Sequence, residues 1–337
     1  MLACAGIQEC WYRGYPPHRG METPASRKTI HSTKGPVMKK PAIAAFVFLG
    51  VIWGSNFVFV KSAAQYISPL QITLLRVLFG FVPVLAYALL TGALRREHWR
   101  HARHFVVMSL LATALYYFAF AMGTALLDTS IAGMLGGAIP LFTFLCAWVF
   151  LRSEPLSGLK VLGVGLGFLG ILLVARPWSA QGAIDPLGVL YMILGSCSVG
   201  CSFVYAKRYI SPLGLPMVAL VTYQIGLALA MLLVVTPLQG IEAVFADTGA
   251  WVRLVFGLGL LGTGAAYLAY YLIVAALGAV AASGVTYIPP VVALLMGAWL
   301  GEPVTGSSWV AVGLILGGVG LVQMRIGGWR GVGLQRD

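Results

Sequence analysis

The stretch GVIWGSNFVFVKSAAQYISP (Gly50–Pro69) is apolar enough to lie in lipid, yet it contains an asparagine, a lysine and a Gly-Ser pair. Much of it returns in SVGCSFVYAKRYISP (Ser198–Pro212), which keeps Gly-x-x-Phe-Val, an aromatic residue, a lysine and the ending Tyr-Ile-Ser-Pro. A pattern that occurs twice at this length indicates a duplicated structural unit.

The composition is that of an integral membrane protein. Of the 337 residues, 59% are hydrophobic and only 9% are charged, whereas roughly a quarter of a soluble domain is charged. About 20 apolar residues in a helix cross a bilayer, and we predict ten such spans, at 42–61, 71–91, 105–125, 130–151, 159–175, 187–207, 215–235, 252–277, 280–300 and 308–324. The runs do not alternate as β-barrel strands do. The predicted fold class is therefore an all-α membrane protein with ten transmembrane helices.

The net charge of +12 would suggest a nucleic-acid partner in a soluble protein, so its placement along the chain is informative. With a cytoplasmic N-terminus, 18 of the 22 Lys and Arg residues fall on the cytoplasmic side, and the outer half keeps only Lys61, Arg76, Arg176 and Arg253. This distribution follows the positive-inside rule. We expect both termini in the cytoplasm, a lipid bilayer as surroundings and no nucleic-acid partner.

The N-terminal residues 1–40 lack the apolar core and cleavage pattern of a signal peptide. We predict a disordered cytoplasmic extension here and a short cytoplasmic tail at 326–337. The segment MKKPAIAAFVF, which begins at Met38, is a basic flank leading directly into the first span. Met38 is therefore a candidate for the true start of translation.

A second pair of similar segments defines the repeat. AIPLFTFLCAWVFLRSEPLSG (Ala138–Gly158) aligns with YIPPVVALLMGAWLGEPVTG (Tyr287–Gly306). The two units, 41–176 and 186–325, contain five spans each, and an odd number inverts the second unit in the membrane. Inverted repeats are the architecture of alternating-access carriers, whose substrate site lies between the halves.

The motifs WGSNFVFVK, IPLFTFLCAWVFLRSEPLS and GVGLGFLGILLV resemble the EamA-type branch of the drug/metabolite transporter superfamily. The resemblance covers nearly all of residues 42–325. It implies a multi-pass protein of the bacterial inner membrane that exports or exchanges small metabolites such as amino acids, with no cofactor.

Polar residues within the spans are the candidates for a substrate cavity. Ser55 and Asn56 lie mid-span and must face protein or water, so they either line a cavity or bond neighbouring helices.

Arg76 lies in the second span and is either a counter-charge for a substrate carboxylate or a partner of helix-end carbonyls. Thr222 lies near the equivalent position in the second repeat. Tyrosines cluster in the third and eighth spans. The full set of candidates is Trp53, Ser55, Asn56, Arg76, Tyr116, Tyr117, Ser202, Tyr205, Gln224, Tyr267, Tyr270 and Tyr287.

Matched prolines, Pro140 and Pro289, interrupt the fourth and ninth spans, and matched interruptions favour moving, site-forming helices. Gly163-x-x-x-Gly167 and Gly313-x-x-x-Gly317 predict close helix packing in the last helix of each repeat and leave a homodimer open.

Acidic residues lie only in termini, loops or helix edges, and all five histidines are predicted outside the spans. Glu154 and Glu302 are expected to cap the helices that follow them. Without a mid-span carboxylate or histidine, facilitated diffusion or gradient-driven efflux is favoured over proton antiport.

Two other classes of protein remain open. His98, His101 and His104 have the three-residue spacing of a membrane metal enzyme, but the interleaved arginines disfavour a metal, and we predict none. Cys197 and Cys201 are interpreted as small packing residues. A non-carrier with the same fold, structural or lipid-translocating, is the other alternative.

Overall fold

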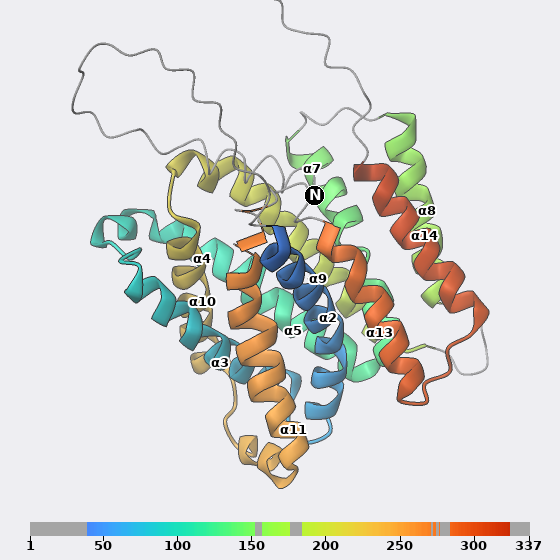
Figure 1. Ribbon diagram of the computed structural model, residues 1–337, viewed down its shortest axis with the longest axis horizontal. Helices are drawn as coiled ribbons and strands as arrows, with labels where there is room; N and C mark the ends of the chain where they lie inside the picture. The colour runs from blue at the N-terminus through green and yellow to red at the C-terminus, as the bar shows by residue number, and fades with distance from the viewer. Residues whose placement is uncertain are drawn as a thin grey trace, which may run out of the picture.

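The computed structural model describes residues 39–151, 157–175, 184–270, 272, 273, 276 and 284–323, and these form helices joined by short turns (Figure 1). Nine helices in these ranges are long and apolar enough to cross a membrane, and Gly284–Trp299 is a shorter apolar helix. The predicted all-α membrane fold is confirmed, and a count of ten spans is consistent with it. The predicted tail, Glu154 and almost all of the N-terminal extension lie outside the described residues.

The first repeat contains four continuous spans and one interrupted span. Its elements are α2 (Lys39–Ala63), α3 (Pro69–Leu90), η1 (Arg96–His101), α4 (Ala102–Ser109), η2 (Leu110–Ala114), α5 (Leu115–Leu126), α6 (Thr129–Gly136), α7 (Ile139–Leu151) and α8 (Gly158–Ala175). The third span is continuous from η1 to α5 but passes through a π-helical turn, η2. The fourth span is broken between α6 and α7.

The second repeat follows the same order. Its described elements are α9 (Pro186–Tyr205), η3 (Ala206–Ile210), η4 (Ser211–Leu213), α10 (Met217–Val235), η5 (Ile241–Ala246), α11 (Thr248–Val252), η6 (Arg253–Ala265), η7 (Gly284–Tyr287), α13 (Ile288–Trp299) and α14 (Gly306–Gln323). η6 is π-helical, like η2 in the third span of the first repeat.

The shared Ser-Pro motif shows how local sequence sets a helix start. Ser68 caps α3 in a capping box: its Oγ accepts the N–H of Gln71 at 3.3 Å, and Gln71 Oε1 accepts the N–H of Ser68 at 2.9 Å. Pro69 suits the first turn because its missing N–H would have no partner there. The second copy has Gly214 in place of the glutamine, and the chain there forms the 3-10 turn η4 and turns at Gly214 with φ of 62°.

The two repeats interlock. The principal helix contacts join one repeat to the other: α3 packs along η6, α10 against α4 and η2, α5 and α7 against α9, α13 against α2 and α6, and α14 against α8. Figure 1 shows α8 and α14 side by side at one edge of the bundle. The two sequence repeats are therefore not separate bundles.

The fourth and ninth spans cross where the fourth span is interrupted. A Cβ added to Gly137, which follows α6, would lie 2.6 Å from Cγ of Pro290. Pro140 and Pro289 are the second residues of α7 and α13, so each lies in the first turn of an α-helix, where the missing N–H costs least. The helix is interrupted before Pro140, whereas before Pro289 the 3-10 turn η7 leads directly into α13.

Glycines allow the closest helix approaches. A Cβ on Gly163 would lie 2.7 Å from the carbonyl oxygen of Gly318, so α8 and α14 pack with their backbones almost touching. Gly167 lies in the same packing face, because a Cβ on Gly318 would lie 2.7 Å from its backbone nitrogen, whereas a Cβ on Gly167 itself would meet Leu141 of α7. Gly313 and Gly317 face open space instead, so the predicted packing is made by Gly318 in α14.

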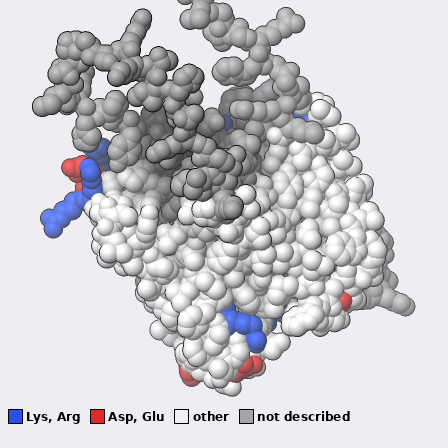
Figure 2. Space-filling view, viewed as in Figure 1, with Lys and Arg blue, Asp and Glu red and all other residues white. Residues whose placement is uncertain are grey.

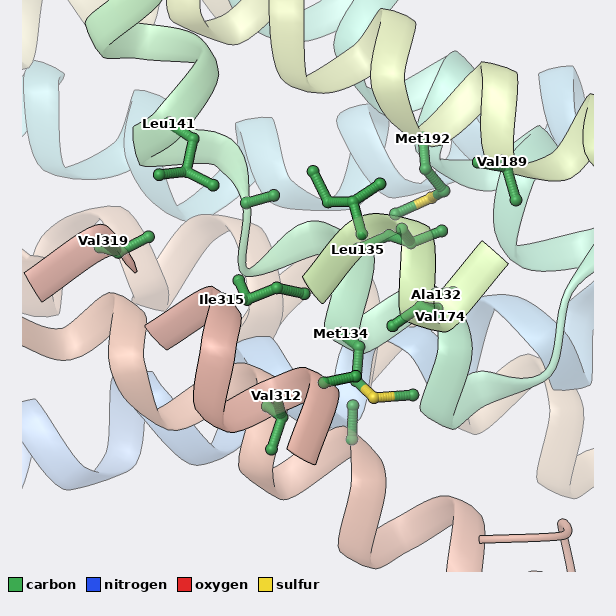
Figure 3. Close-up of a cluster of buried hydrophobic side chains, with 14 of the residues drawn as sticks. Ala132, Met134, Leu135, Leu141, Val174, Val189, Met192, Val312, Ile315 and Val319 are labelled. Carbon is green, nitrogen blue, oxygen red and sulfur yellow. The ribbon is translucent and has the colours of Figure 1, made fainter. Parts of the chain in front are cut away.

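An apolar cluster fills the space between the interrupted fourth span and the last helix of each repeat (Figure 3). Leu135, Leu141, Met192 and Ile315 from four different helices meet in it. In the space-filling view, charged side chains gather at the margins of the visible face and leave an uncharged belt between them (Figure 2). This belt is the surface that a bilayer requires.

Candidate functional site

Arg76 lies at the interface of the two repeats. It is the eighth residue of α3 and is 9% exposed. Its Nε–H donates to Thr263 Oγ1 of η6 at 2.9 Å, and its guanidinium carbon lies 3.8 Å from the ring centroid of Tyr117 in α5. Arg76 therefore bridges the third helix of one repeat and the corresponding helix of the other, and the tyrosine ring partly compensates the buried charge.

The π-helical geometry of η6 orients the partner of Arg76. The hydroxyl of Thr263 donates to the carbonyl of Leu258 at 3.0 Å, five residues earlier, and so leaves its lone pairs for Arg76. Within the described residues, Thr263 is the only hydrogen-bond partner of the Arg76 side chain, and no carboxylate pairs with it. Four of the five guanidinium N–H groups thus remain available.

The same contact exists in the other half with a neutral side chain. Gln224 is the eighth residue of α10, as Arg76 is of α3. Its Nε2 donates to Thr113 Oγ1 in the π-helical turn η2 at 2.8 Å. The counterpart of Arg76 by contact is therefore Gln224; the expected counterpart, Thr222, turns its hydroxyl back to the carbonyl of Val218.

Asn56 supplies an unpartnered acceptor beside this contact. It is 7% exposed, and among the described residues its Oδ1 is a buried atom with no hydrogen-bond partner. It faces Gly262, the residue before Thr263, where any added Cβ would collide with Oδ1. An unsatisfied buried amide oxygen is costly, and this one lies against the helix turn that holds Arg76.

Aromatic rings surround the arginine. Tyr116 contacts Tyr117 with ring centroids 5.0 Å apart and Phe120 at 4.7 Å. Tyr267 packs against the cluster that contains Tyr117. The structure therefore brings together Asn56, Arg76, Tyr116, Tyr117, Gln224 and Tyr267 around the two threonines.

The other sequence candidates have different partners. Ser55 and Ser202 donate to their own helix, to the carbonyls of Val51 and Val199. Trp53 pairs with Tyr270 at 6.2 Å. The hydroxyl of Tyr287 donates to Gln323 at 3.0 Å in α14.

Tyr205 and the histidine-rich segment form a separate cluster. His104 Nδ1 lies 2.8 Å from the hydroxyl of Tyr205, and His98 packs edge-on to Tyr223. Both histidines are buried, because tyrosines of the second repeat cover them, and they lie at the start of a continuous helical segment, Arg96–Leu126, that is longer than a bilayer requires. That they lie outside the membrane-crossing part of the third span stays a prediction. In the part of the chain described, no three His, Cys, Asp or Glu side chains group as a metal site would require.

Glu302 has a different partner from the one expected. Its carboxylate accepts the N–H groups of Thr129 at 2.7 Å and Ser130 at 2.8 Å, and so caps α6 of the first repeat. The expectation that it caps the following helix, α14, is wrong, because the interlocked packing places the start of α6 closer to it. The carboxylate is a favourable partner for a helix N-terminus.

Sequence reasoning missed the two threonines. Thr113 and Tyr117, and Thr263 and Tyr267, have the same four-residue spacing 150 positions apart. Aligning the third and eighth spans would have revealed this signal. No sequence pattern of this kind indicates that these threonines lie in π-helical turns.

Comparison with known proteins fits this architecture. The EamA-like transporter family matches the chain twice, over residues 40–176 and 186–324. The chain belongs to the EamA-like transporter family. Relatives include the uncharacterized transporter YdfC of Bacillus subtilis, 27% identical over 276 residues (82% of this chain and 88% of the relative), and the uncharacterized inner membrane transporter YedA of Escherichia coli K12, 25% identical over 289 residues (84% and 91%).

A solved crystal structure shares the fold, with a TM-score of 0.53 and 21% identity over 83% of this chain and 95% of that one. Like the other members matched, this EamA-like protein is a multi-pass membrane transporter, and the resemblance expected from the sequence is confirmed.

Proposed function

We propose that this transporter carries small solutes that bear a carboxylate, with amino acids as the principal class, by alternating access. The observation that carries the proposal is the buried Arg76. Its charge has no acidic partner among the described residues, and every Asp and Glu of the chain is predicted outside the membrane spans. A substrate carboxylate would supply the missing negative charge.

The chemistry around Arg76 suits a zwitterion. The free guanidinium N–H groups can hold a carboxylate through two parallel hydrogen bonds. The Asn56 Oδ1 can accept a hydrogen bond from a substrate ammonium group, which a simple organic anion lacks. Tyr116 and Tyr117 would offer ring faces to the side chain of the substrate.

The interlocked repeats suggest how access alternates. We propose that the moving parts are pairs of helices from different repeats, since the strongest packing joins the repeats. The interruption at Gly137 lies against Pro290, and we propose that the fourth span bends at this interruption and the ninth span at the junction of η7 and α13.

The charge distribution supports a proposed orientation, and the composition of the Arg76 cluster supports a proposed direction. We propose that both termini lie in the cytoplasm of a bacterial inner membrane, because 18 of 22 basic residues then fall inside. The direction proposed is efflux along the gradient of the solute, since neither a carboxylate nor a histidine accompanies Arg76 in the cluster.

The test is counterflow in proteoliposomes preloaded with a mixture of amino acids and organic anions. The variants are Arg76→Gln and a matched control, Arg253→Gln; Arg253 Nε also donates to a hydroxyl, Ser62 Oγ at 3.0 Å, but outside the cluster. Loss of about 3 kcal/mol of charge-assisted binding predicts a fall in exchange of roughly 100-fold for Arg76→Gln. The control should stay within about twofold.

Other outcomes would contradict the proposal. Full exchange by Arg76→Gln would remove the arginine from recognition. Exchange of cationic or lipid solutes alone would refute the substrate class while leaving a transporter of this family.

A further inference from the structure

Three cysteines converge where α7 of the first repeat meets α9 of the second. Cys146 lies in α7, and Cys197 and Cys201 lie one turn apart in α9. The sulfur atoms of Cys146 and Cys201 are 3.3 Å apart, although the residues are 55 positions apart in sequence. Packing alone was expected of Cys197 and Cys201; the structure adds a thiol partner from the other repeat.

A glycine causes this close approach. A Cβ on Gly200 would lie 3.0 Å from the backbone nitrogen of Thr143 and 3.1 Å from its Cα, so the α7 and α9 backbones nearly touch. The hydroxyl of Thr143 donates to the carbonyl of Ile139 in its own helix and so does not separate α7 from α9. Cys201 follows the glycine, and Cys146 comes one turn after the threonine.

We propose that Cys146 and Cys201 form a modification site, a dithiol that a small peroxide oxidises to a disulfide joining the two repeats. A disulfide has an S–S length of about 2.0 Å, so the sulfurs must approach by about 1.3 Å. Both side chains are partly exposed, and a small neutral peroxide can enter the bilayer to reach them.

The reaction balances in two steps. The first thiol, as thiolate, attacks a peroxide oxygen; hydrogen peroxide gives a sulfenic acid and one water. The second thiol attacks the sulfenic sulfur and displaces the oxygen as a second water, which forms the S–S bond. Two thiols lose two electrons, and the peroxide gains them. A thiol reductant reverses the change.

The disulfide would hold α7 against α9. α7 is the half-helix that begins at the break before Pro140. The proposed function requires bending at this break, which moves α7 relative to α6, and a disulfide from α7 to α9 would oppose that bend. The modification site itself rests on the thiol geometry and not on any substrate.

The first experiment measures the cross-link in the full chain, with Cys4→Ser and Cys10→Ser as the background and a protease site inserted in the connection between α8 and α9. After peroxide treatment and cleavage, the two fragments should remain joined on a non-reducing gel and separate with dithiothreitol. Cys146→Ser and Cys201→Ser should abolish the link.

The matched control is Cys197→Ser, on the same helix, which should keep the link. Elution of each variant as a single species on size-exclusion chromatography establishes that it is folded. Separate fragments from oxidised parent protein, or an equal link in Cys146→Ser, would overturn the proposal.

The second experiment measures counterflow of the cross-linked protein, and it rests on the proposed function. We expect a fall of at least about tenfold that dithiothreitol reverses and that Cys146→Ser does not show. Full-speed counterflow with complete cross-linking would refute the effect on transport, while the carrier function would stand.

Discussion

Arg76 and Gln224 occupy the same place in the two repeats, and each reaches a threonine in a π-helical turn of the other repeat. One contact carries a positive charge and the other is neutral. Inverted repeats by themselves would make the two sides of the interface chemically alike. Duplication therefore explains where the two polar contacts lie. The difference between arginine at position 76 and glutamine at position 224 makes only one of them charged.

The strongest test of this comparison moves the charge. Arg76→Gln alone should lose roughly 100-fold of carboxylate exchange, as above. Adding Gln224→Arg should recover about tenfold of that loss, because the new guanidinium would lie beside Thr113, as Arg76 lies beside Thr263, and the ring equivalent to Tyr117 is then Tyr267. Counterflow by the double variant measures this recovery. No recovery, in a folded protein, would show that the two sides are not equivalent.

A second test compares Asn56 with Ser202, its counterpart in the Gly-x-x-Phe-Val pattern. Asn56 has an unpartnered oxygen, whereas Ser202 bonds to its own helix at 2.7 Å. Asn56→Ala should raise KM for an amino acid about tenfold, the effect of one hydrogen bond to a charged group of about 1.5 kcal/mol. Ser202→Ala should change KM less than about twofold. Equal effects of the two variants would contradict the assignment.

The neutral contact should matter for stability more than for transport. Gln224→Leu removes the 2.8 Å bond to Thr113 and should lower the free energy of unfolding by about 0.6 to 1.5 kcal/mol, as for other hydrogen bonds between membrane helices. Thermal unfolding in detergent measures this change. Counterflow should stay within about twofold; a loss as large as that of Arg76→Gln would make Gln224 a substrate contact.

The smallest effect is expected at a partly exposed contact between the repeats. The pKa of Asp247 lies below its ordinary value because its carboxylate accepts the N–H of Ala250 at 3.0 Å and then the hydroxyl of Tyr66 at 3.0 Å. A lowered pKa means that the carboxylate stabilises the fold above about pH 4 and that this contribution is lost as the pH falls through the folded-state pKa.

Tyr66→Phe isolates this contact. The Tm of Tyr66→Phe should lie slightly below that of the wild type at about pH 6, and the difference should shrink as the pH falls below about 4. The partly exposed position keeps the effect small. A difference that grows in acid would contradict the sign.

Much of the fold could be predicted from the sequence. The length of each apolar run is set by the thickness of the bilayer, and the basic residues concentrate in the cytoplasmic loops. The repeated motifs at Gly50–Pro69 and Ser198–Pro212 predicted the duplication. The interlocking of the repeats did not follow, because it depends on which faces of equally apolar helices meet. That choice is made by single glycines such as Gly200 and Gly318, whose neighbours only the structure supplies.

The candidate site was predicted less completely. Arg76, Asn56 and Tyr117 became candidates because a polar side chain inside a membrane span is costly unless it faces protein or water. Tyr205 and Tyr287 were grouped with them by residue type, but each has a structural partner, His104 and Gln323. Residue type indicates a need for a partner; the backbone path decides which partner is near.

The interlocked packing has a consequence for how such a protein arises and is made. Gly54 of the first helix meets Val292 of the ninth span, and Gly163 of the fifth meets Gly318 of the tenth. An ancestor with only five helices would have left these faces without partners unless a second copy inserted in the opposite orientation. In the present chain, the closest contacts of the first and fifth helices can form only after the last two helices have been synthesised and inserted.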